Sequence, residues 1–508
     1  MGFFQNADPL VLVAFIGYLA IMLAIGFYFS NKSKNMNEYF LAGRGLNSWV
    51  TAMSAQASDM SGWLLMGLPG AAYATGMGNY WIAIGLAIGT ILNWAFVAKP
   101  LRRFTEAAGD SITIPQYLQN RFKTDSPIVR LVCAVVIFIF FLVYTVSAFV
   151  SGGYLFQVVF DIDTSNEMFT KIAVIASALI IIAYTLMGGF SAVAWTDFIQ
   201  GLLMFIAIIA LPIALIRNID NFSLDMINET QKIVAEGENA AGFASLFENR
   251  SGNAIISDLA WALGYFGMPH ILVRFMAIKD AKSVKKSAII AIIWVLISLG
   301  AAVFIGILGR LYLDGQGITL ASAEQELIFI KVVKMLFPGI FAGIFLSAVL
   351  AAIMSTADSQ LLVTASAVAN DFFKVVAKKD VSEKTTMWVS RGAVIAISVI
   401  ACILALDPKD SIMGIVSNAW AGFGAAFGPA IILSLYWKRL TLKGTVAGII
   451  AGAGTVLLWD NILHLGGIMY SIVPGFAASI LLTVIVSLID KAPSKEVLEI
   501  FEKAKTIE

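Results

Sequence analysis

The chain has 508 residues, of which 59% are hydrophobic and only 13% are charged, and its mean hydropathy is +0.85. Soluble globular proteins contain about 45–50% apolar and about 25% charged residues, so this composition excludes a water-soluble enzyme. The 34 basic and 33 acidic residues leave a net charge of +1, which provides no field to attract nucleic acid. We therefore expect one polytopic membrane domain over 1–508, in contact with a lipid bilayer and without a nucleic-acid partner.

Apolar segments recur along the whole chain, and a membrane-spanning helix needs about 20 mostly apolar residues. The first segment, 9–30, has neither a basic leading region nor a small-residue cleavage site, so we expect a spanning helix and not a signal peptide. In chain order, the sequence predicts about thirteen spanning helices: 9–30, 48–70, 77–98, 128–158, 171–188, 192–216, 254–277, 286–310, 335–360, 388–406, 411–437, 444–464 and 469–489.

The basic residues agree with this count, because cytoplasmic loops of membrane proteins are rich in Lys and Arg. With the N-terminus outside and thirteen crossings, the cytoplasmic segments hold 26 of the 34 basic residues, with Arg274 counted among them. The outer stretches 161–167 and 218–250 are rich in acidic residues. We expect a multi-pass protein of the bacterial cytoplasmic membrane, with the tail 490–508 inside the cell.

Asp59 interrupts the second apolar segment, in the stretch SAQASDMSGW from 54 to 63. Ionisable residues within a bilayer are costly and therefore mark functional candidates. Small and polar residues around Gly62, followed by Pro69 and Gly70, predict a locally unwound helix whose carbonyl oxygens could bind a small cation. The alternative is an ordinary kink, with Asp59 paired to a neighbouring helix.

The seventh segment holds a second interruption, because Gly264, Gly267 and Pro269 fall within six residues and such residues break helices. Two broken helices five spans apart are typical of transporters built from two repeats, which must be inverted because five is odd. Trp261 and Tyr265 lie one helical turn apart and share a face. They either line a pocket or pack as ordinary core aromatics.

Hydroxyl and carboxylate side chains gather at the end of the ninth segment. Ser355, Thr356, Asp358 and Ser359 follow one another at helical spacings, and hydroxyls suit a hard monovalent cation. Isolated Ser and Thr more commonly bond within their own helix or to a neighbour. A cation held by Ser355, Thr356 and the unwound backbone at 57–60 would join the ninth helix to the second.

Asp197 is a third acid next to an apolar segment, and it is either functional or an interfacial helix cap. The sequence contains only two histidines, so no histidine metal centre is expected. We find no nucleophile–base pair and expect no enzyme activity.

Five motifs resemble the sodium/solute symporter family, and in particular its bacterial members that take up proline. These motifs are ASDMSGWLLMGLPG at 57–70, WTD at 195–197, GYFGMPHI at 264–271, MST at 354–356 and AWAGFGAAFGP at 419–429. The resemblance extends from about Tyr18 to the last apolar segment. It implies an all-α membrane fold with the inverted five-helix repeats of the leucine transporter, at 48–216 and 254–437. The helix 9–30 precedes them, and two helices at 444–489 follow.

The resemblance also implies functional residues. It implies a sodium site formed by Ala57, Met60, Ala352, Ser355 and Thr356. It implies coupling roles for Asp59 and Arg44. It implies proline contacts at Ser61, Gly62, Trp63, Tyr144, Trp261, Tyr265 and Pro269. The chain differs from the proline-transporting members at Met268, where they have Gln, and at Asp358–Ser359, where they have Ser–Cys. Together with Asp197, Asp358 and Ser359 raise the possibility of a second cation site.

We therefore expect symport of sodium and L-proline by alternating access, with sodium co-transported, no organic cofactor and no obligate protein partner. One alternative is sodium symport of another small solute such as pantothenate. A second is a membrane sensor that binds solute without transport, which we disfavour because no signalling domain follows Asp490. A channel is disfavoured because two broken helices predict an occluded midplane site.

Overall fold

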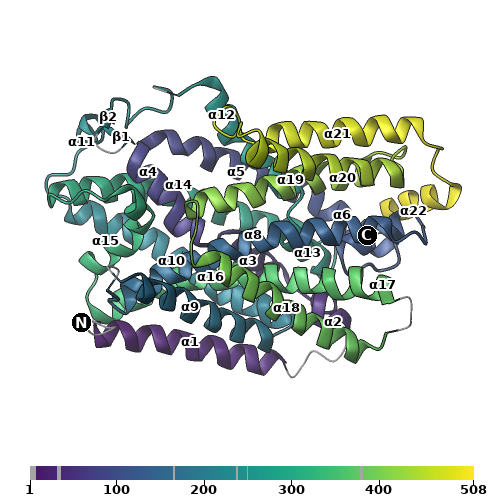
Figure 1. Ribbon diagram of the computed structural model, residues 1–508, viewed down its shortest axis with the longest axis horizontal. Helices are drawn as coiled ribbons and strands as arrows, with labels where there is room; N and C mark the ends of the chain where they lie inside the picture. Colours follow the sequence, from purple (N-terminus) through teal and green to yellow (C-terminus); the bar gives the residue numbers. More distant parts are fainter. Residues whose placement is uncertain are drawn as a thin grey trace.

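Long helices run side by side along the longest axis of the molecule (Figure 1). This computed structural model describes residues 7–30, 36–163, 166–235, 238–248, 250–377 and 381–507. Its helices are α1 (Pro9–Ser30), α2 (Met36–Leu41), α3 (Ser48–Asp59), α4 (Leu68–Thr75), α5 (Tyr80–Leu92), α6 (Lys99–Ala107), α7 (Ile114–Arg121), α8 (Ile128–Val159), α9 (Glu167–Met187), α10 (Phe190–Asn218), α11 (Leu224–Glu229), α12 (Gly252–Leu259), α13 (Pro269–Ala277), α14 (Val284–Gly315), α15 (Ile328–Leu336), α16 (Gly339–Ser366), α17 (Lys374–Ala377), α18 (Glu383–Ala405), α19 (Ile412–Tyr436), α20 (Leu442–Leu457), α21 (Ile472–Ile489) and α22 (Lys495–Thr506).

Short 3-10 or π-helical stretches connect several of these helices. They occupy Ala42–Arg44, Trp63–Gly67, Gly76–Asn79, Asn93–Ala98, Ala260–Phe266, Ser322–Leu327, Ala367–Phe373 and Leu458–Ile462. Two short strands, β1 (Lys232–Ala235) and β2 (Glu238–Ala240), pair antiparallel, with Lys232 opposite Ala240. They lie with α11 at the end of the molecule opposite α22 (Figure 1).

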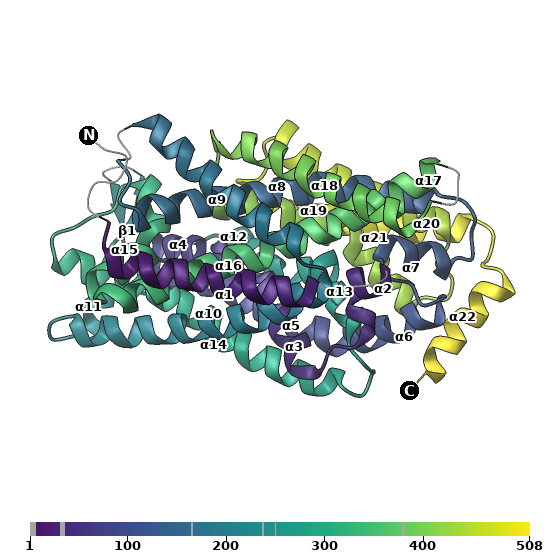
Figure 2. The same ribbon diagram turned by 90° about the horizontal axis from the view of Figure 1, so that it is seen from below.

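Eleven helical segments of the described residues are long and apolar enough to cross a membrane. One of them, Trp63–Ala107, combines the second half of the predicted span 48–70 with the span 77–98. The predicted span 254–277 is absent from the eleven, because its helices α12 and α13 are short. The count of thirteen crossings stays a prediction. The first helix, α1, begins at the end opposite α22 (Figures 1 and 2), which fits an odd number of crossings.

Burial separates the inner helices from the outer ones. The most apolar window is 83% buried in α19 and 78% buried in the segment Gly339–Ala377, which contains α16, but only 28% buried in α1 and in α18. Polar side chains on α16 and α19 therefore face protein, whereas α1 and α18 present many apolar side chains at the surface of the molecule. The broken helix α3 packs against α16 and α13, so its polar residues also lie inside the bundle.

At the end that carries α22, the loop after α13 is held by two segments of the first half of the chain. Leu46 accepts a hydrogen bond from the backbone of Lys279 at 3.0 Å and donates one to Ala277 at 3.3 Å. The Arg102 guanidinium donates to the carbonyl of Ile278 at 2.9 Å. These contacts join the segment before α3 and helix α6 to the end of α13.

Candidate functional site

Helix α3 stops inside the bundle. It is capped at its start by Asn47, whose side-chain oxygen accepts two backbone N–H groups at 3.0 Å, and it ends at Asp59. Met60 leaves helical geometry with φ −91° and ψ 83°, and the chain becomes helical again from Gly62. A side chain at Gly62 would lie 2.6 Å from the Ser151 hydroxyl, so glycine permits the close approach of α8.

A second departure from α-helical geometry follows α12. The chain continues as a 3-10 stretch over Ala260–Phe266, Met268 is extended with ψ 107°, and α13 begins at Pro269. Proline suits a first helical position, because its missing N–H would have no partner there and its φ is already helical. The backbone carbonyl and N–H groups between α12 and α13 therefore do not form the regular hydrogen bonds of an α-helix.

Asp59 connects these two irregular segments. Its side chain is fully buried, and its Oδ2 accepts a hydrogen bond from the Tyr265 hydroxyl at 2.6 Å. Its backbone carbonyl accepts one from the Trp63 indole at 3.1 Å. The other carboxylate oxygen, Oδ1, has no hydrogen-bond partner. A buried carboxylate with one free oxygen is an energetically costly arrangement in an apolar interior and can serve a cation or a cationic ligand.

The hydroxyls of α16 meet the backbone of α3 where the sequence predicts. The Ser355 hydroxyl donates to the carbonyl of Ala57 at 2.7 Å, and it also lies 3.2 Å from the carbonyl of Ala352. The Thr356 hydroxyl lies 3.5 Å from the same Ala57 oxygen. Four of the five proposed sodium ligands therefore form one buried group of oxygens, and the fifth, Met60, lies at the non-helical turn.

This oxygen group differs from a metalloenzyme centre. Among the described residues, no group of three or more His, Cys, Asp and Glu side chains is placed to hold a metal ion. Neutral carbonyl and hydroxyl oxygens suit a weakly polarising monovalent cation, which needs oxygen ligands without a large total negative charge.

Aromatic rings cover the irregular segments. The Trp63 and Trp261 rings lie 6.4 Å apart, Trp261 and Trp420 lie 6.1 Å apart, and Tyr265 meets Trp420 edge-on at 5.0 Å. Tyr470 stacks on Trp261 at 5.3 Å. Neither Trp420 nor Tyr470 was predicted individually as a site residue. Trp420 could have been found, because it stands in the glycine-rich motif at 419–429. No sequence pattern marks Tyr470, which lies in the turn before α21.

Trp420 holds its position through the backbone of the second irregular segment. Its indole donates to the carbonyl of Trp261 at 2.8 Å. Its ring lies where a side chain at Gly264 would be, and α19 approaches the same backbone at Gly424, where a Cβ would be 2.7 Å from the Cα of Gly264. Glycine at Gly264 therefore allows the tryptophan to cover the segment.

Gly267 provides a test of this close packing. A methyl group at this position would collide with the carbonyl of Phe423 and lie 2.8 Å from the backbone nitrogen of Gly428, and backbone atoms cannot rotate away. We expect Gly267→Ala to reduce the free energy of unfolding by about 1–3 kcal/mol, measured by titration with dodecyl sulfate and tryptophan fluorescence. Gly454→Ala is the matched control, because nothing lies within 4 Å of its added methyl; equal stability of the two variants would contradict the prediction.

The remaining predicted substrate residues fall into two groups. Ser61, Gly62 and Tyr144 are buried next to Trp63 or on the facing helix α8, and the Tyr144 hydroxyl has no hydrogen-bond partner. Pro269, in contrast, lines a different, mostly apolar cavity of about 20 Å³.

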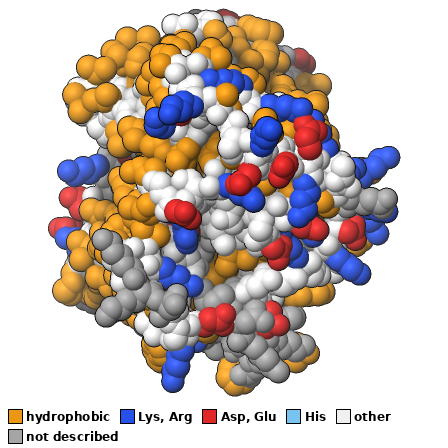
Figure 3. Space-filling view, turned by 90° about the vertical axis from the view of Figure 1, so that its right-hand side faces the viewer, with side chains coloured by type: hydrophobic (Ala, Val, Ile, Leu, Met, Phe, Trp, Pro, Cys, Tyr) orange, Lys and Arg blue, Asp and Glu red, His pale blue; other side chains and the backbone are white. Residues whose placement is uncertain are grey.

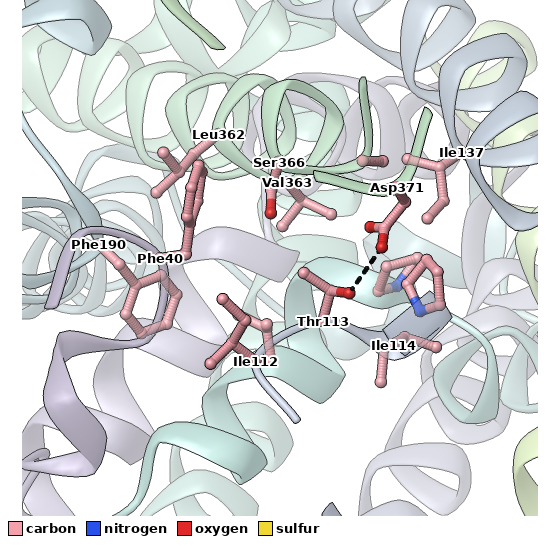
Figure 4. Close-up of a pocket in the computed structure, with 14 residues that line it drawn as sticks. Phe40, Ile112, Thr113, Ile114, Ile137, Phe190, Leu362, Val363, Ser366 and Asp371 are labelled. Atoms are coloured by element: carbon pink, nitrogen blue, oxygen red, sulfur yellow. Dashed lines mark hydrogen bonds between the residues drawn. The ribbon is translucent and has the colours of Figure 1, made fainter. Parts of the chain in front are cut away.

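That small cavity lies beside a polar cluster at the base of α16. Figure 4 shows Thr113 pointing at Asp371, with 3.3 Å between their side-chain oxygens. Asp371 is fully buried and forms an ion pair with Arg130 at 2.8 Å. The cluster ties the start of α7 and α8 to the π-helical stretch after α16. Apart from Ser366, the rest of the cavity wall is apolar (Figure 4).

Asp197 is fully buried, which does not fit an interfacial cap. Its Oδ2 accepts hydrogen bonds from the Ser54 hydroxyl at 2.6 Å and from the Arg274 guanidinium at 3.0 Å. Arg274 also donates to the Ser359 hydroxyl at 2.5 Å. Counting Arg274 as a cytoplasmic loop residue was therefore wrong: its side chain is fully buried inside the bundle.

Asp358 completes this buried group. Its Oδ1 lies 3.3 Å from the Ser359 hydroxyl, while its Oδ2, like Oδ1 of Asp197, has no hydrogen-bond partner. The sequence suggests Asp197, Asp358 and Ser359 for a second cation. In the structure, the positive charge between Asp197 and Ser359 is the guanidinium of Arg274.

Arg44 lies away from this centre, in the 3-10 stretch before α3. Its guanidinium forms an ion pair with Asp110 at 2.7 Å and donates to the carbonyls of Met276 at 2.8 Å and Ser111 at 3.0 Å. Arg44 itself has a positive φ of 54°, an uncommon conformation for a residue other than glycine. It connects the segment before α3 to the loop after α6 and to the last turn of α13.

Comparison with known proteins gives a consistent result. The family model for the sodium:solute symporter family matches residues 39–452. The high-affinity proline transporter PutP of Bacillus subtilis (strain 168) is 44% identical over 94% of this chain and 98% of its own length. The sodium/proline symporter of Escherichia coli (strain K12) is 42% identical over 97% of this chain and 96% of its own.

Two solved structures have the same fold. The substrate-bound, outward-open structure of a Na⁺-coupled sialic acid symporter covers 96% of this chain and 99% of its own, with a TM-score of 0.78 and 21% identity. The nucleobase-cation-symport-1 family transporter Mhp1, in a closed conformation, covers 92% of this chain and 98% of its own, with a TM-score of 0.54 and 14% identity. The predicted class of fold, an all-α transporter of the leucine-transporter type, is confirmed. The chain is a multi-pass membrane protein and belongs to the sodium:solute symporter family.

Proposed function

We propose that this protein couples sodium entry to the uptake of L-proline. One observation carries the sodium part: the Ser355 hydroxyl of α16 reaches the carbonyl of Ala57 at 2.7 Å, two residues before the buried Asp59. The choice of proline is supported by two relatives more than 40% identical over nearly their whole length, whose names state that they transport proline.

Sodium would be held by the carbonyls of Ala57, Met60 and Ala352 and by the hydroxyls of Ser355 and Thr356. In the described conformation, Ser355 and Thr356 hydrogen-bond to the Ala57 carbonyl. A sodium ion replaces these contacts by bonds from the same oxygens, so it stabilises the conformation in which α3 and α16 are joined. A ligand shifts a conformational equilibrium only if it binds one conformation more tightly than the other. Tighter binding of sodium to the conformation in which α3 and α16 are joined would therefore couple sodium binding to substrate binding.

Proline would lie between the irregular segments, beside the rings of Trp63, Trp261 and Tyr265. Its pyrrolidine ring is apolar and packs on aromatic faces. Its charged groups need polar partners, and the Tyr144 hydroxyl and the free oxygen of Asp59 are both buried without one. Ser61 and Gly62, at the non-helical turn, provide backbone groups on the same side. Pro269 would act indirectly, by fixing the start of α13.

In alternating access, the substrate site opens to one side of the membrane at a time. For the site to open toward the end of the molecule that carries Arg44 and α22, the contacts at that end would have to break. Release at this end would break the backbone bonds between Leu46 and the end of α13. It would also break the ion pair and hydrogen bonds of Arg44, which reach Asp110, Thr105, Met276 and Ser111. We assign this end to the cytoplasm, with the N-terminus outside, because the basic residues gather in its loops. The transporter domain would comprise the repeats 48–216 and 254–437, with 9–30 and 444–489 added and a tail at 490–508.

A second cation at Asp197, Asp358 and Ser359 stays a separate proposal. Arg274 donates to two of these three residues, so a second ion would have to share or displace those contacts. The two free carboxylate oxygens of the cluster favour such an ion, whereas the buried guanidinium disfavours it by charge repulsion.

Uptake of labelled proline into proteoliposomes tests the proposal. An inward sodium gradient is expected to drive accumulation, whereas a proton gradient of equal size is not. Unlabelled proline is expected to compete, and pantothenate is not. Accumulation that is equally fast without sodium would overturn sodium coupling, and competition by pantothenate but not by proline would replace the proposed substrate.

A further inference from the structure

A groove of about 470 Å³ opens where α6, the end of α19 and α22 meet. Its floor contains Phe104 and Phe501, whose rings meet edge-on at 5.3 Å. Three basic side chains surround this floor, Arg103 from α6, Lys438 after α19 and Lys505 from α22, and no acidic side chain lines the groove. The groove therefore combines an apolar floor with a positively charged rim.

The positive charge of this rim is incompletely neutralised. A single carboxylate, that of Glu502, pairs with Lys438 and lies 3.4 Å from Lys505. The Nε of Arg103 is buried and has no hydrogen-bond partner, and the nearby Glu106 pairs with Arg102 instead. The groove thus retains an excess of positive charge and a buried donor, both of which an anion would satisfy.

The position of the groove relative to the membrane limits the choice of anion. Helix α19 ends at Tyr436, whose hydroxyl donates a hydrogen bond to the carbonyl of Phe96 at 2.5 Å. Tyr436 is 53% exposed and Phe96 is 55% exposed. Aromatic side chains with a polar end favour the headgroup level of a bilayer. Leu92, one turn further toward the membrane centre, is also exposed. A lipid-facing apolar strip therefore leads from the membrane directly to the groove.

We propose that this groove binds the phosphate headgroup of an anionic phospholipid, whose acyl chains lie along Phe96 and Leu92. The phosphate would lie among Arg103, Lys438 and Lys505 and relieve their mutual repulsion. Because these residues come from three different segments, the lipid would also fasten α22 to the transmembrane helices. Figure 3 shows this end of the molecule face on, with basic and acidic side chains interspersed over it and hydrophobic side chains at its margins.

Native mass spectrometry of the full chain in detergent, titrated with phosphatidylglycerol, tests the proposal. Each basic residue near an anionic headgroup strengthens binding by about fivefold. The variant Arg103→Gln/Lys438→Gln/Lys505→Gln is therefore expected to bind phosphatidylglycerol about a hundredfold more weakly. The matched control, Lys285→Gln/Lys384→Gln/Lys491→Gln, removes the same charge from exposed positions outside the groove and is expected to bind like the unaltered chain.

Lys505→Gln alone, at a half-exposed position near the chain end, keeps the test valid if the triple variant does not fold, and it is expected to weaken binding about fivefold. Phosphatidylcholine, which is zwitterionic, is expected to bind weakly to all variants. Equal losses in the groove and control variants, or no loss in either, would overturn the proposal. Displacement of the lipid by inorganic phosphate in modest excess would also overturn it, since the groove would then be a site for the free anion.

Discussion

Replacing Asp59 by asparagine is expected to abolish sodium-stimulated proline uptake while the protein still inserts and folds. Asparagine keeps an oxygen that can accept the Tyr265 hydrogen bond, now 2.6 Å long, but it removes the negative charge of the carboxylate. Two opposite charges about 4 Å apart attract each other by about 4 kcal/mol at an effective dielectric constant of about 20, which is the largest loss that we expect for a sodium ion bound near Asp59. That free energy corresponds to roughly a thousandfold loss of sodium affinity.

The initial rate of proline uptake into proteoliposomes, measured against sodium concentration, checks this result. Tyr265→Phe is the matched variant, because it removes the hydrogen bond to Asp59 and keeps the charge. Hydrogen bonds to charged groups contribute about 1.5–3 kcal/mol, so we expect sodium affinity to fall about tenfold to a hundredfold, less than in Asp59→Asn. Normal uptake by Asp59→Asn at low sodium concentration would contradict a role of Asp59 in coupling proline uptake to sodium.

Replacing Arg274 by methionine is expected to destabilise the protein by about 3–5 kcal/mol, because it leaves a buried carboxylate without its cation. The guanidinium is fully buried, and it donates to Asp197, Ser359 and the carbonyl of His270 at distances of 3.0, 2.5 and 2.7 Å. Methionine fills a similar volume, so the loss would come from the charge and the hydrogen bonds and not from a cavity.

The double variant Arg274→Met/Asp197→Leu separates the ion pair from other causes. Replacing both partners of a buried pair by apolar residues is often neutral or stabilising, so most of the lost stability is expected to return. Titration with dodecyl sulfate, followed by tryptophan fluorescence, measures each variant. Lys443→Met, which breaks an exposed pair with Asp490, is the control and is expected to cost at most about 1 kcal/mol. A double variant as unstable as Arg274→Met would contradict the ion-pair explanation.

Several features of this protein follow from the sequence alone. The membrane class follows from composition, because the thickness of a bilayer fixes the length of an apolar segment whatever surrounds it. The departure from α-helical geometry before Pro269 follows from Gly267 and Pro269, whose effects on the backbone are local. The departure after Asp59 was predicted in the same way, from Gly62 and the Pro69–Gly70 pair. The approach of Ser355 to the backbone at 57–60 was also expected from the polar residues of the two segments, and the family resemblance named Ala57 within that stretch.

Other features depend on the tertiary structure. Arg274 has the local sequence of a basic residue at a helix end, and only the arrival of α10 and α16 beside α13 gives it buried partners, Asp197 being 77 positions away. Trp420 and Tyr470 cover the irregular segment at Trp261 from α19 and from the turn before α21. Contacts of this kind depend on which helix faces lie opposite each other. The spacing of residues in the sequence shows which side chains share one face of a helix, but not which other helix packs on that face. These contacts are therefore decided by the tertiary structure alone.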